Sequence, residues 1–369
     1  MARPAMRRNS QSAGSRKVFA GISVYATLLM LGACATNKPP PVERYTVEIP
    51  AGVADARARF KEIFCAVLEE YGTSLPDYRP CEEAVTPVIP EPAATGRPVD
   101  LGRSHRHLVA ALVAGVGYSC IVRWLDPPAT AVAQLRKHNY DFLSLEVDAL
   151  SGIEINARQI RDAIMARPEE PGPPRLVLIG YSKGAPDILE AVVRYPEIQS
   201  RVAAVLSAGG AVGGSVLAND AQQWQANLFR YWPGARCDEG DGGAVESLRP
   251  EVRQAWLERN PLPTEMPFYS LVTLPTPERV SQIVKPTYKK LGRIDWRNDS
   301  QLIYYEQIIP GSTLLGFINA DHWALAVPVN RSHPTIASTL VDKNDYPREA
   351  MLEAALRFIE EDLDKRRLR

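Results

Sequence analysis

RLVLIGYSKGAP, at residues 175–186, joins a short apolar run to a glycine-flanked serine and then to a proline. The run Leu-Val-Leu-Ile favours a strand that is buried on both faces, whereas Pro186 is typical of the first turn of a helix. A sharp turn between the two would hold Ser182 in strained dihedral angles and leave space only for glycine at positions 180 and 184. The stretch therefore predicts a strand, a tight turn and a helix, with the hydroxyl of Ser182 raised above the edge of a sheet.

The segments around this unit repeat the alternation of strand and helix. Apolar runs typical of buried strands lie at 107–115, 142–147, 202–206, 268–274 and 312–319, and helical spacing of apolar residues is found at 55–71, 129–138, 153–164, 186–195 and 349–363. Alternating strands and helices predict an α/β fold, with a mostly parallel central sheet and helices on both faces.

The first 34 residues are typical of an export signal. Residues 1–33 hold five basic residues and no acidic ones, and the apolar run Val18–Leu31 suits a signal-peptide core better than a membrane span. The run ends in Leu31-Gly32-Ala33-Cys34, which resembles the lipobox of bacterial lipoproteins. The resemblance implies cleavage before Cys34 and lipidation of its thiol. An ordinary secretory signal and an uncleaved anchor remain open. Thr36, which is not an Asp, favours the outer membrane over the inner membrane.

The remaining sequence suggests four further segments. Residues 34–54 are predicted to form a Pro-rich tether, and residues 55–104 an N-terminal helical extension. The core of the fold is expected at 105–208 and 267–369. Residues 209–266 interrupt the alternation and are expected to form a cap whose aromatic residues line an acyl pocket or form the cap's own small core. These aromatic residues are Trp224, Phe229, Tyr231, Trp232 and Trp256.

The charge of the chain bears on which partners it binds, and its cysteines bear on the compartment in which it folds. Without residues 1–33, 38 basic residues face 43 acidic ones, a formal net charge of −5, so nothing favours nucleic-acid binding. Export would place the four cysteines beyond Cys34 in an oxidising compartment. We predict the pairs Cys65–Cys81 and Cys120–Cys237, with buried free thiols as the alternative. No cysteine spacing is typical of a zinc site.

A serine at its ordinary pKa is a poor nucleophile and needs a general base. On such a fold the base is expected after the last core strands, and among the five histidines only His322 and His333 follow Ser182 in the chain. His322 comes directly after the predicted strand 312–319, at the sheet edge that carries the serine. His333 precedes a proline in a polar loop, so His322 is the predicted base.

The base in turn needs a carboxylate that orients its imidazole. The carboxylates between the fifth strand and His322 are Glu278, Asp295, Asp299, Glu306 and Asp321. Asp299 lies in a turn that leads into an apolar stretch, 23 residues before His322, and is the predicted acid. Glu278 and Asp295 remain rivals, whereas Asp321 adjoins the histidine and is expected to point elsewhere.

The stretch 106–328 resembles the α/β-hydrolase superfamily on its esterase and lipase side. The motif at 180–184, the acid turn at 298–302 and the strand end at His322 carry the resemblance, in the family's order of Ser, Asp and His. It implies an oxyanion hole formed by the N–H of Lys183 and an N–H of Val116 or Gly117, of which we expect Val116. It also implies a reaction that needs no metal ion or organic cofactor.

These observations together predict a serine hydrolase that cleaves carboxylic esters through an acyl-enzyme. A thioesterase, amidase or acyltransferase with the same three residues is the first alternative. A non-catalytic envelope lipoprotein on the same fold is the second. The expected partners are an ester substrate and, through the lipid on Cys34, the periplasmic side of the outer membrane. The oligomeric state is open.

Overall fold

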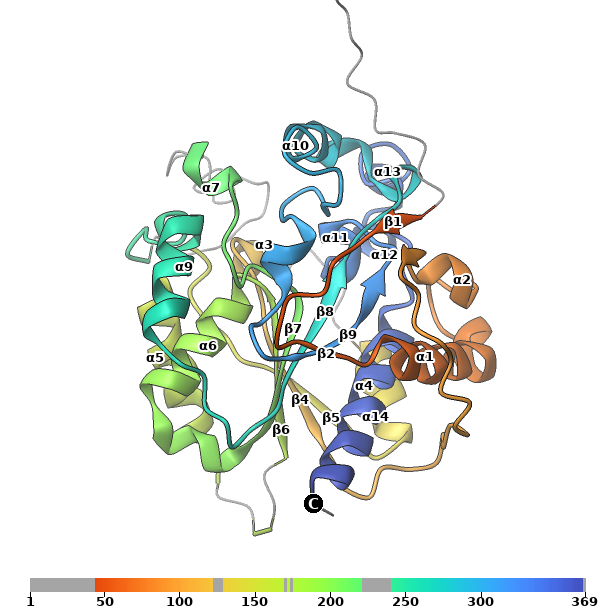
Figure 1. Cartoon of the computed structure of the whole chain (residues 1–369), viewed down its shortest axis with the longest axis horizontal. Coiled ribbons are helices and arrows are strands. Elements are labelled where there is room, and N and C mark those ends of the chain that lie inside the picture. Colours follow the sequence, from red (N-terminus) through yellow and green to blue (C-terminus); the bar gives the residue numbers. More distant parts are fainter. Residues whose placement is uncertain (1–43, 122–128, 169–170, 173–174, 221–239, 368–369) are drawn as a thin grey trace, which may run out of the picture. The chain divides into compact units, whose positions relative to one another are not determined.

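The computed structural model describes residues 44–121, 129–168, 171–172, 175–220 and 240–367. They contain a seven-stranded sheet in the order β2-β9-β8-β7-β6-β4-β5, in which all neighbouring strands are parallel (Figure 1). The strands are β2 (Ala54–Asp55), β4 (Val109–Val113), β5 (Asp141–Ser144), β6 (Leu176–Ser182), β7 (Val202–Gly210), β8 (Phe268–Thr273) and β9 (Thr313–Ile318). The expected α/β fold is therefore confirmed, and each of the six predicted strands is present.

The strand order reverses direction at β4. From β4 the chain moves outward to β5, returns to β6 on the other side of β4, and then continues through β7 and β8 to β9. In open parallel sheets, ligands bind beyond the carboxyl ends of the strands at such a reversal. At this reversal, the carboxyl end of β4 leads to Gly115 and β6 ends at Ser182.

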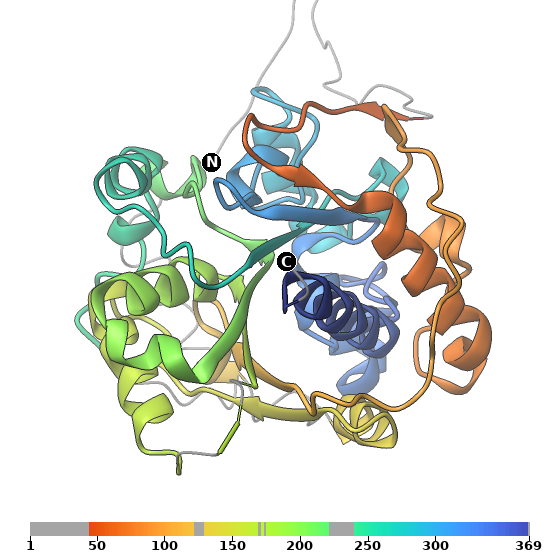
Figure 2. The same ribbon diagram turned by 60° about the horizontal axis from the view of Figure 1, so that its bottom comes forward.

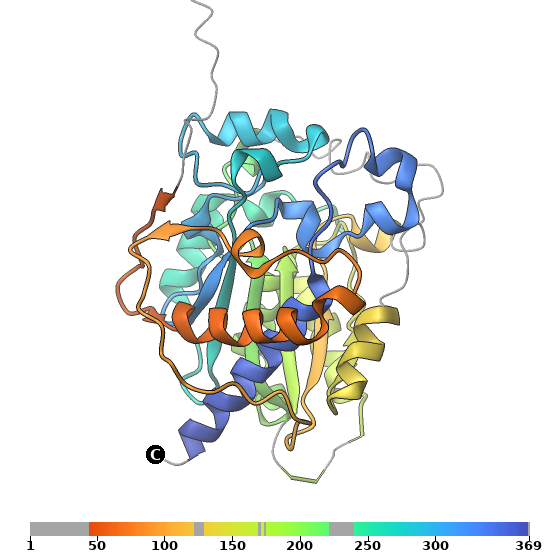
Figure 3. The same cartoon turned by 90° about the vertical axis from the view of Figure 1, so that its right-hand side faces the viewer.

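Helices cover both faces of the sheet. The helices α5 (Ile153–Met165) and α6 (Gly184–Arg194) pack together on one face, over a core that includes Ile160 and Ile188. The other face carries α1 (Arg57–Tyr71), α4 (Ala129–Lys137) and α14 (Arg348–Arg367). Figure 2 shows the two layers on opposite sides of the sheet, and in Figure 3 α1 crosses α14. Burial on both faces explains why the strands are almost uniformly apolar.

The segment 44–104 contributes three short strands, and the helix predicted at 55–71 is present as α1. The strand β1 (Tyr45–Thr46) pairs with β3 (Val88–Ile89), and β2 forms an edge of the main sheet beside β9. The side chains of Tyr45 and Val47 are buried. The sequence did not indicate these strands because two-residue strands carry no periodic signal. Their formation depends on partners that are distant in the sequence.

A disulfide bond joins Cys65 on α1 to Cys81 at the start of α2 (Cys81–Ala84), as predicted. Cys237 lies outside the described residues, so its pairing with Cys120 stays a prediction. Residues 1–43 also lie outside them, and with them Cys34 and the predicted signal segment. No helix in the described part of the chain is both long enough and apolar enough to cross a membrane.

The insertion 209–266 contributes to two places in the fold. The strand β7 extends as far as Gly210, and α7 (Leu217–Asp220) follows it. The helix α9 (Pro250–Arg259) packs beside α6, where Trp256 donates a hydrogen bond from Nε1 to Glu190. Trp256 therefore belongs to the helical layer on that face of the sheet. The other four aromatic residues of the predicted cap lie outside the described residues.

Among the described residues, two further α-helices and five 3-10 helices lie between β6 and β9 or directly after β9. They are η3 (Pro196–Arg201), η5 (Glu246–Leu248), η6 (Pro277–Arg279), η7 (Gln282–Val284), α10 (Lys285–Leu291), η8 (Tyr304–Gln307) and α11 (His322–Ala326). The remaining helices are η1 (Gly72–Ser74), α3 (Tyr118–Ile121), α12 (Val329–Ser332) and α13 (Pro334–Ala337).

Candidate active site

Ser182 occupies the predicted sharp turn between β6 and α6. Its φ angle is 54°, a left-handed conformation that a non-glycine residue rarely adopts. A Cβ atom at Gly180 would lie 2.4 Å from Cα of Ala185, and one at Gly184 would lie 2.0 Å from the carbonyl oxygen of Val113. Both flanking positions therefore require glycine because the backbone of a neighbouring segment fills the space of a side chain.

His322 is the first residue of α11, at the carboxyl end of β9. Its Nδ1 atom lies 2.7 Å from Oδ2 of Asp299, and its backbone N–H donates to the carbonyl oxygen of Asp299 at 2.9 Å. Asp321 begins the helix because its Oδ1 atom accepts the N–H of Ala324 at 2.9 Å. The position of His322 is therefore fixed by a helix cap on one side and by Asp299 on the other.

Asp299 is completely buried, yet both of its carboxylate oxygens have partners. Oδ1 accepts the backbone N–H groups of Gln301 at 2.9 Å and Leu302 at 2.7 Å. Oδ2 accepts the hydroxyl of Thr273, at the end of β8, in addition to its contact with His322. These bonds hold the carboxyl group in one orientation, with Oδ2 directed at His322.

The rival residues make other contacts. Asp295 pairs with Arg297, with 2.6 Å between Oδ2 and Nη2. The second carboxylate oxygen of Asp321 accepts the N–H of Ser281 at 2.8 Å, and burial raises the pKa of this carboxyl group. Neither Glu278 nor His333 lines the cavity that contains Ser182 and His322. Among the described residues, only Asp299 therefore joins a carboxylate to His322.

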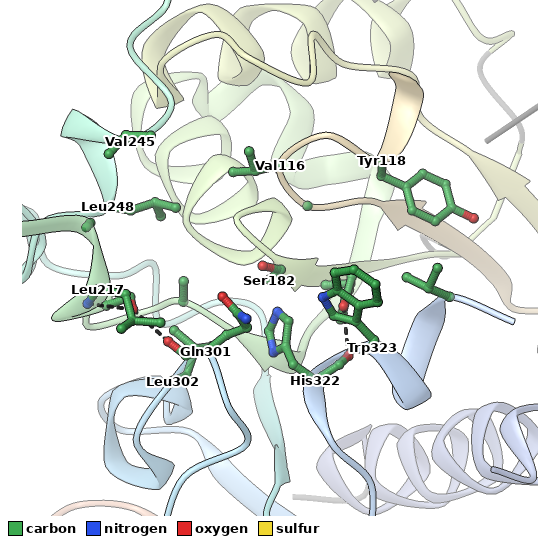
Figure 4. Close-up of a pocket in the computed structure, with 16 residues that line it drawn as sticks. Val116, Tyr118, Ser182, Leu217, Val245, Leu248, Gln301, Leu302, His322 and Trp323 are labelled. Atoms are coloured by element: carbon green, nitrogen blue, oxygen red, sulfur yellow. Dashed lines mark hydrogen bonds between the residues drawn. The ribbon is translucent and has the colours of Figure 1, made fainter. Parts of the chain in front are cut away.

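Ser182 and His322 face one cavity of about 300 Å³ at the carboxyl edge of the sheet (Figure 4). Within the described residues the hydroxyl of Ser182 forms no hydrogen bond, either to the imidazole or to another group. Catalytic hydrogen bonds are often long in the absence of substrate and shorten when it binds. The fold thus brings the three predicted residues to one edge of the sheet, with the Asp–His contact formed and the Ser–His contact open.

Two backbone N–H groups near Ser182 have no hydrogen-bond partner among the described residues. Within the described part of the chain, neither the N–H of Lys183 nor that of Val116 donates to another residue, whereas the N–H of Gly117 donates to the carbonyl oxygen of Ala149 at 3.3 Å. A Cβ atom at Gly115 would lie 2.5 Å from Cβ of Ser182, so the loop after β4 passes directly beside the serine. Of the two residues left open by the sequence, Val116 is therefore the one with an available donor.

Sequence analysis did not identify Tyr181 as a neighbour of His322. The Tyr181 hydroxyl donates to the carbonyl oxygen of His322 at 2.8 Å, and the two ring centroids are 5.0 Å apart with 30° between the planes. Burial raises the pKa of this phenol well above its ordinary value, and the charge of Asp299 adds to the effect. The hydroxyl is therefore a permanent donor. Its position next to the serine in the motif was the only signal in the sequence.

The cavity is mostly apolar. Its lining consists largely of aliphatic and aromatic side chains. These are Val116, Leu217, Ala218, Val245, Leu248, Leu302 and Val327, together with Tyr118, Tyr181 and Trp323. Gln301 also lines the cavity, and Figure 4 shows its carboxamide on the same side as Ser182 and His322. Its backbone is fixed because its carbonyl oxygen accepts the hydroxyl of Ser215 at 2.6 Å. The arrangement suits an apolar substrate with a polar reacting group.

The fold and this geometry can be compared with known proteins. No protein-family model matches the chain, and no curated protein sequence matches it. Among solved structures, the metagenomic carboxyl esterase MGS0156 is 34% identical, with a TM-score of 0.79 over 89% of this chain and 98% of that one. The chain belongs to the carboxyl esterase family of α/β-hydrolases.

Two more distant solved structures share the fold of the present chain. The mature lipase BlEst2 of Bacillus licheniformis is 19% identical, with a TM-score of 0.50 over 66% of this chain and 95% of that one. EstA from Clostridium botulinum is 11% identical, with a TM-score of 0.50 over 85% of this chain and 99% of that one. The predicted resemblance to esterases and lipases is thus confirmed, and the protein is an ester hydrolase of the carboxylesterase and lipase type.

Proposed function

We propose that this esterase hydrolyses carboxylic esters with Ser182 as nucleophile, His322 as general base and Asp299 as the residue that orients the imidazole. The observation that carries the proposal is the 2.7 Å contact between Asp299 and His322 beside a cavity that also contains Ser182. Asp299 accepts the proton on Nδ1, which leaves Nε2 of His322 to accept the hydroxyl proton.

The reaction then proceeds in two acyl-transfer steps. Oγ of Ser182 attacks the ester carbonyl carbon while its proton passes to Nε2 of His322, and a tetrahedral intermediate forms. The N–H groups of Lys183 and Val116 donate to the negatively charged oxygen of this intermediate. Its collapse breaks the bond to the alkoxy oxygen, which receives the proton from His322 and leaves as the alcohol. Water, deprotonated by the same imidazole, then attacks the carbonyl carbon of the acyl-enzyme. The bond from this carbon to Oγ of Ser182 breaks, Oγ receives the proton from His322, and the carboxylic acid is released.

The lining of the cavity supports an ester with an apolar acyl or alcohol group. Most of the lining side chains are aliphatic or aromatic, and Gln301 supplies a carboxamide near the reacting groups. Thioesters, amides and transfer of the acyl group to an alcohol would use the same three residues. Product analysis in water with and without added alcohol separates hydrolysis from acyl transfer.

The membrane attachment also belongs to the proposal. It is supported by the basic residues of 1–33, by the apolar run 18–31 and by the small residues before Cys34. A diacylglycerol on Cys34 would retain the esterase at the periplasmic side of the outer membrane. Metabolic labelling with a fatty-acid analogue tests this directly. Wild-type protein is expected to be labelled and the Cys34→Ser variant is not. Equal labelling of both would exclude lipidation at Cys34.

The catalytic assignment is tested with a fluorophosphonate probe and a nitrophenyl-ester series. Ser182→Ala and His322→Ala are expected to lose both labelling and turnover. The matched control is His333→Ala, because His333 lies outside the cavity and should retain wild-type turnover. Labelling of Ser182→Ala at the wild-type level would remove the assignment.

A further inference from the structure

Four buried polar side chains form a cluster behind the turn that carries Ser182. They are Lys183, Asp187 on α6, Asn156 on α5 and Arg253 on α9, and each is at most 1% exposed. None of the four lines the cavity that contains Ser182. Lys183 therefore cannot act on a substrate there through its ammonium group, although it adjoins the proposed nucleophile.

Asp187 holds Lys183 at two points. Nζ of Lys183 donates to both carboxylate oxygens of Asp187, at 2.7 and 3.0 Å. In return, the backbone N–H of Asp187 donates to the carbonyl oxygen of Lys183 at 3.2 Å. The side chain and the carbonyl group of residue 183 are thus both bound to one residue in the first turn of α6. The backbone N–H of Lys183 is left without a partner in the described part of the chain.

The other two members of the cluster extend this support. Asn156 donates from Nδ2 to Oδ2 of Asp187 at 2.8 Å. Arg253 donates from Nε to the carbonyl oxygen of Val212 at 3.2 Å, directly after Ala211, whose N–H donates to the carbonyl oxygen of Ser182 at 2.9 Å. The carbonyl group of the Ser182–Lys183 peptide unit and that of the next unit are therefore both hydrogen-bonded, and Arg253 on α9 binds the chain next to Ala211.

Stability alone is a weak explanation for the Lys183–Asp187 pair. Burial lowers the pKa of the Lys183 ammonium, and the carboxylate of Asp187 opposes that shift. Removing two charges from water costs about as much as their mutual attraction returns, so apolar residues of similar volume often replace a buried ion pair without loss of stability. A pair that gives little stability can still fix the orientation of the backbone to which it is attached.

We propose that Lys183 and Asp187 are positioning residues that orient the Ser182–Lys183 peptide, so that its N–H points at the oxyanion of the tetrahedral intermediate. The inference rests on the proposed role of Ser182 as nucleophile. It assigns a function to the side chain of Lys183 that is separate from the function of its backbone.

The test is the double variant Lys183→Met/Asp187→Leu, which removes both charges and keeps side chains of similar length and branching. It is expected to fold, to lose roughly 10- to 100-fold in kcat and to keep its KM within about twofold, because loss of one oxyanion donor costs about 10²- to 10³-fold and misalignment costs less. Its affinity for a trifluoromethyl ketone, which forms an oxyanion adduct with serine, is expected to fall by the same factor as kcat.

The matched control is the pair Glu353 and Arg357 on α14, which is also buried and four residues apart, with 2.8 Å between Nε and Oε1. Glu353→Leu/Arg357→Met is expected to keep the wild-type kcat and inhibitor affinity, whatever its effect on stability. Should Lys183→Met/Asp187→Leu not fold, Asp187→Asn takes its place, with a smaller loss of kcat expected in the same direction.

Wild-type kcat and inhibitor affinity in the folded Lys183→Met/Asp187→Leu variant would overturn the inference. So would a loss of kcat without a matching loss of inhibitor affinity. These outcomes are distinct from failure of the proposed function, in which Ser182→Ala itself would retain turnover.

Discussion

His322 is bound to Asp299 twice, through Nδ1 to the carboxylate at 2.7 Å and through its backbone N–H to the carbonyl oxygen at 2.9 Å. A side-chain contact alone would leave the loop free to shift, whereas two contacts fix the imidazole relative to the carboxylate. Because the carboxylate can only accept, Nδ1 must carry the proton and Nε2 is left as the acceptor. The contact therefore determines which nitrogen faces the cavity as a base.

Asp299→Asn tests this relationship. The N–H groups of Gln301 and Leu302 would hold the amide oxygen where Oδ1 now lies, so that the amide NH₂ would face Nδ1 of His322. The proton would then reside on Nε2, and the imidazole could not accept the proton of Ser182. We expect kcat for a nitrophenyl ester to fall about 10³- to 10⁴-fold with little change in KM.

Asp295→Asn is the matched control for this variant. It removes the pairing with Arg297, outside the cavity, and is expected to leave kcat unchanged. A large loss of kcat in Asp295→Asn, with Asp299→Asn unaffected, would show that the carboxylate has been assigned to the wrong turn.

The central sheet and the approximate site could be predicted from the sequence because their signals are local. A strand buried on both faces must be apolar along its whole length, as β6 and β7 are. The turn at Ser182 requires glycine at positions 180 and 184 because backbone atoms fill the side-chain space. Asp299 and His322 could be chosen because parallel strands end at one edge of the sheet.

The features that sequence analysis missed depend on contacts between distant residues. The strand β2 exists because it pairs with β9, more than 250 residues later, and two residues carry no pattern of their own. The contact of Tyr181 with His322 joins the end of β6 to the start of α11, which lie 141 residues apart in the sequence. The choice of Val116 over Gly117 followed from the bond that Gly117 makes to Ala149, which no spacing in the sequence indicates.

Tyr181→Phe is expected to weaken the site without removing a catalytic group. The ring can still pack against His322, but the carbonyl oxygen of His322 loses the hydrogen bond from the Tyr181 hydroxyl. A hydrogen bond of this kind contributes about 0.5–1.5 kcal/mol, so urea unfolding should show a loss of that order. We also expect kcat to fall several-fold because the imidazole is held less firmly.

Tyr346→Phe is the comparison that separates the two effects. The hydroxyl of Tyr346 donates to the carbonyl oxygen of Ala84 at 3.1 Å, and the residue is buried outside the cavity. A similar loss of stability with an unchanged kcat is expected. If both variants changed kcat equally, the contact of Tyr181 with His322 would have no special role.

The disulfide bond Cys65–Cys81 is expected to stabilise the fold without affecting catalysis. It joins α1 to α2 across a sequence separation of 16 residues, and neither cysteine lines the cavity. Closing a loop of this length contributes about 3 kcal/mol by restricting the unfolded chain. Cys65→Ala/Cys81→Ala should lower the free energy of unfolding by that order and keep the wild-type kcat at a temperature where it is folded. An unchanged urea midpoint would contradict the prediction.

Glu306 gives the fold a pH dependence close to the site. Burial and, to a smaller extent, the charge of Asp299 raise the pKa of Glu306 to about 8, although Oε2 accepts the N–H of Ile303 at 2.7 Å. Between the ordinary pKa of 4.5 and about 8, the folded protein keeps a proton that the unfolded chain releases. The free energy of unfolding should therefore decrease as pH rises through this interval.

Glu306→Gln removes this titration and keeps an oxygen that can accept the Ile303 N–H. The variant and the wild type are expected to have similar free energies of unfolding at pH 5. At pH 9 the variant should be more stable, by a few kcal/mol at most, since one pKa unit corresponds to about 1.4 kcal/mol. Urea unfolding at both pH values measures the difference. If Glu306→Gln were less stable than the wild type at pH 9, the fold would tolerate the ionised carboxylate of Glu306. The pKa of Glu306 would then lie near its ordinary value.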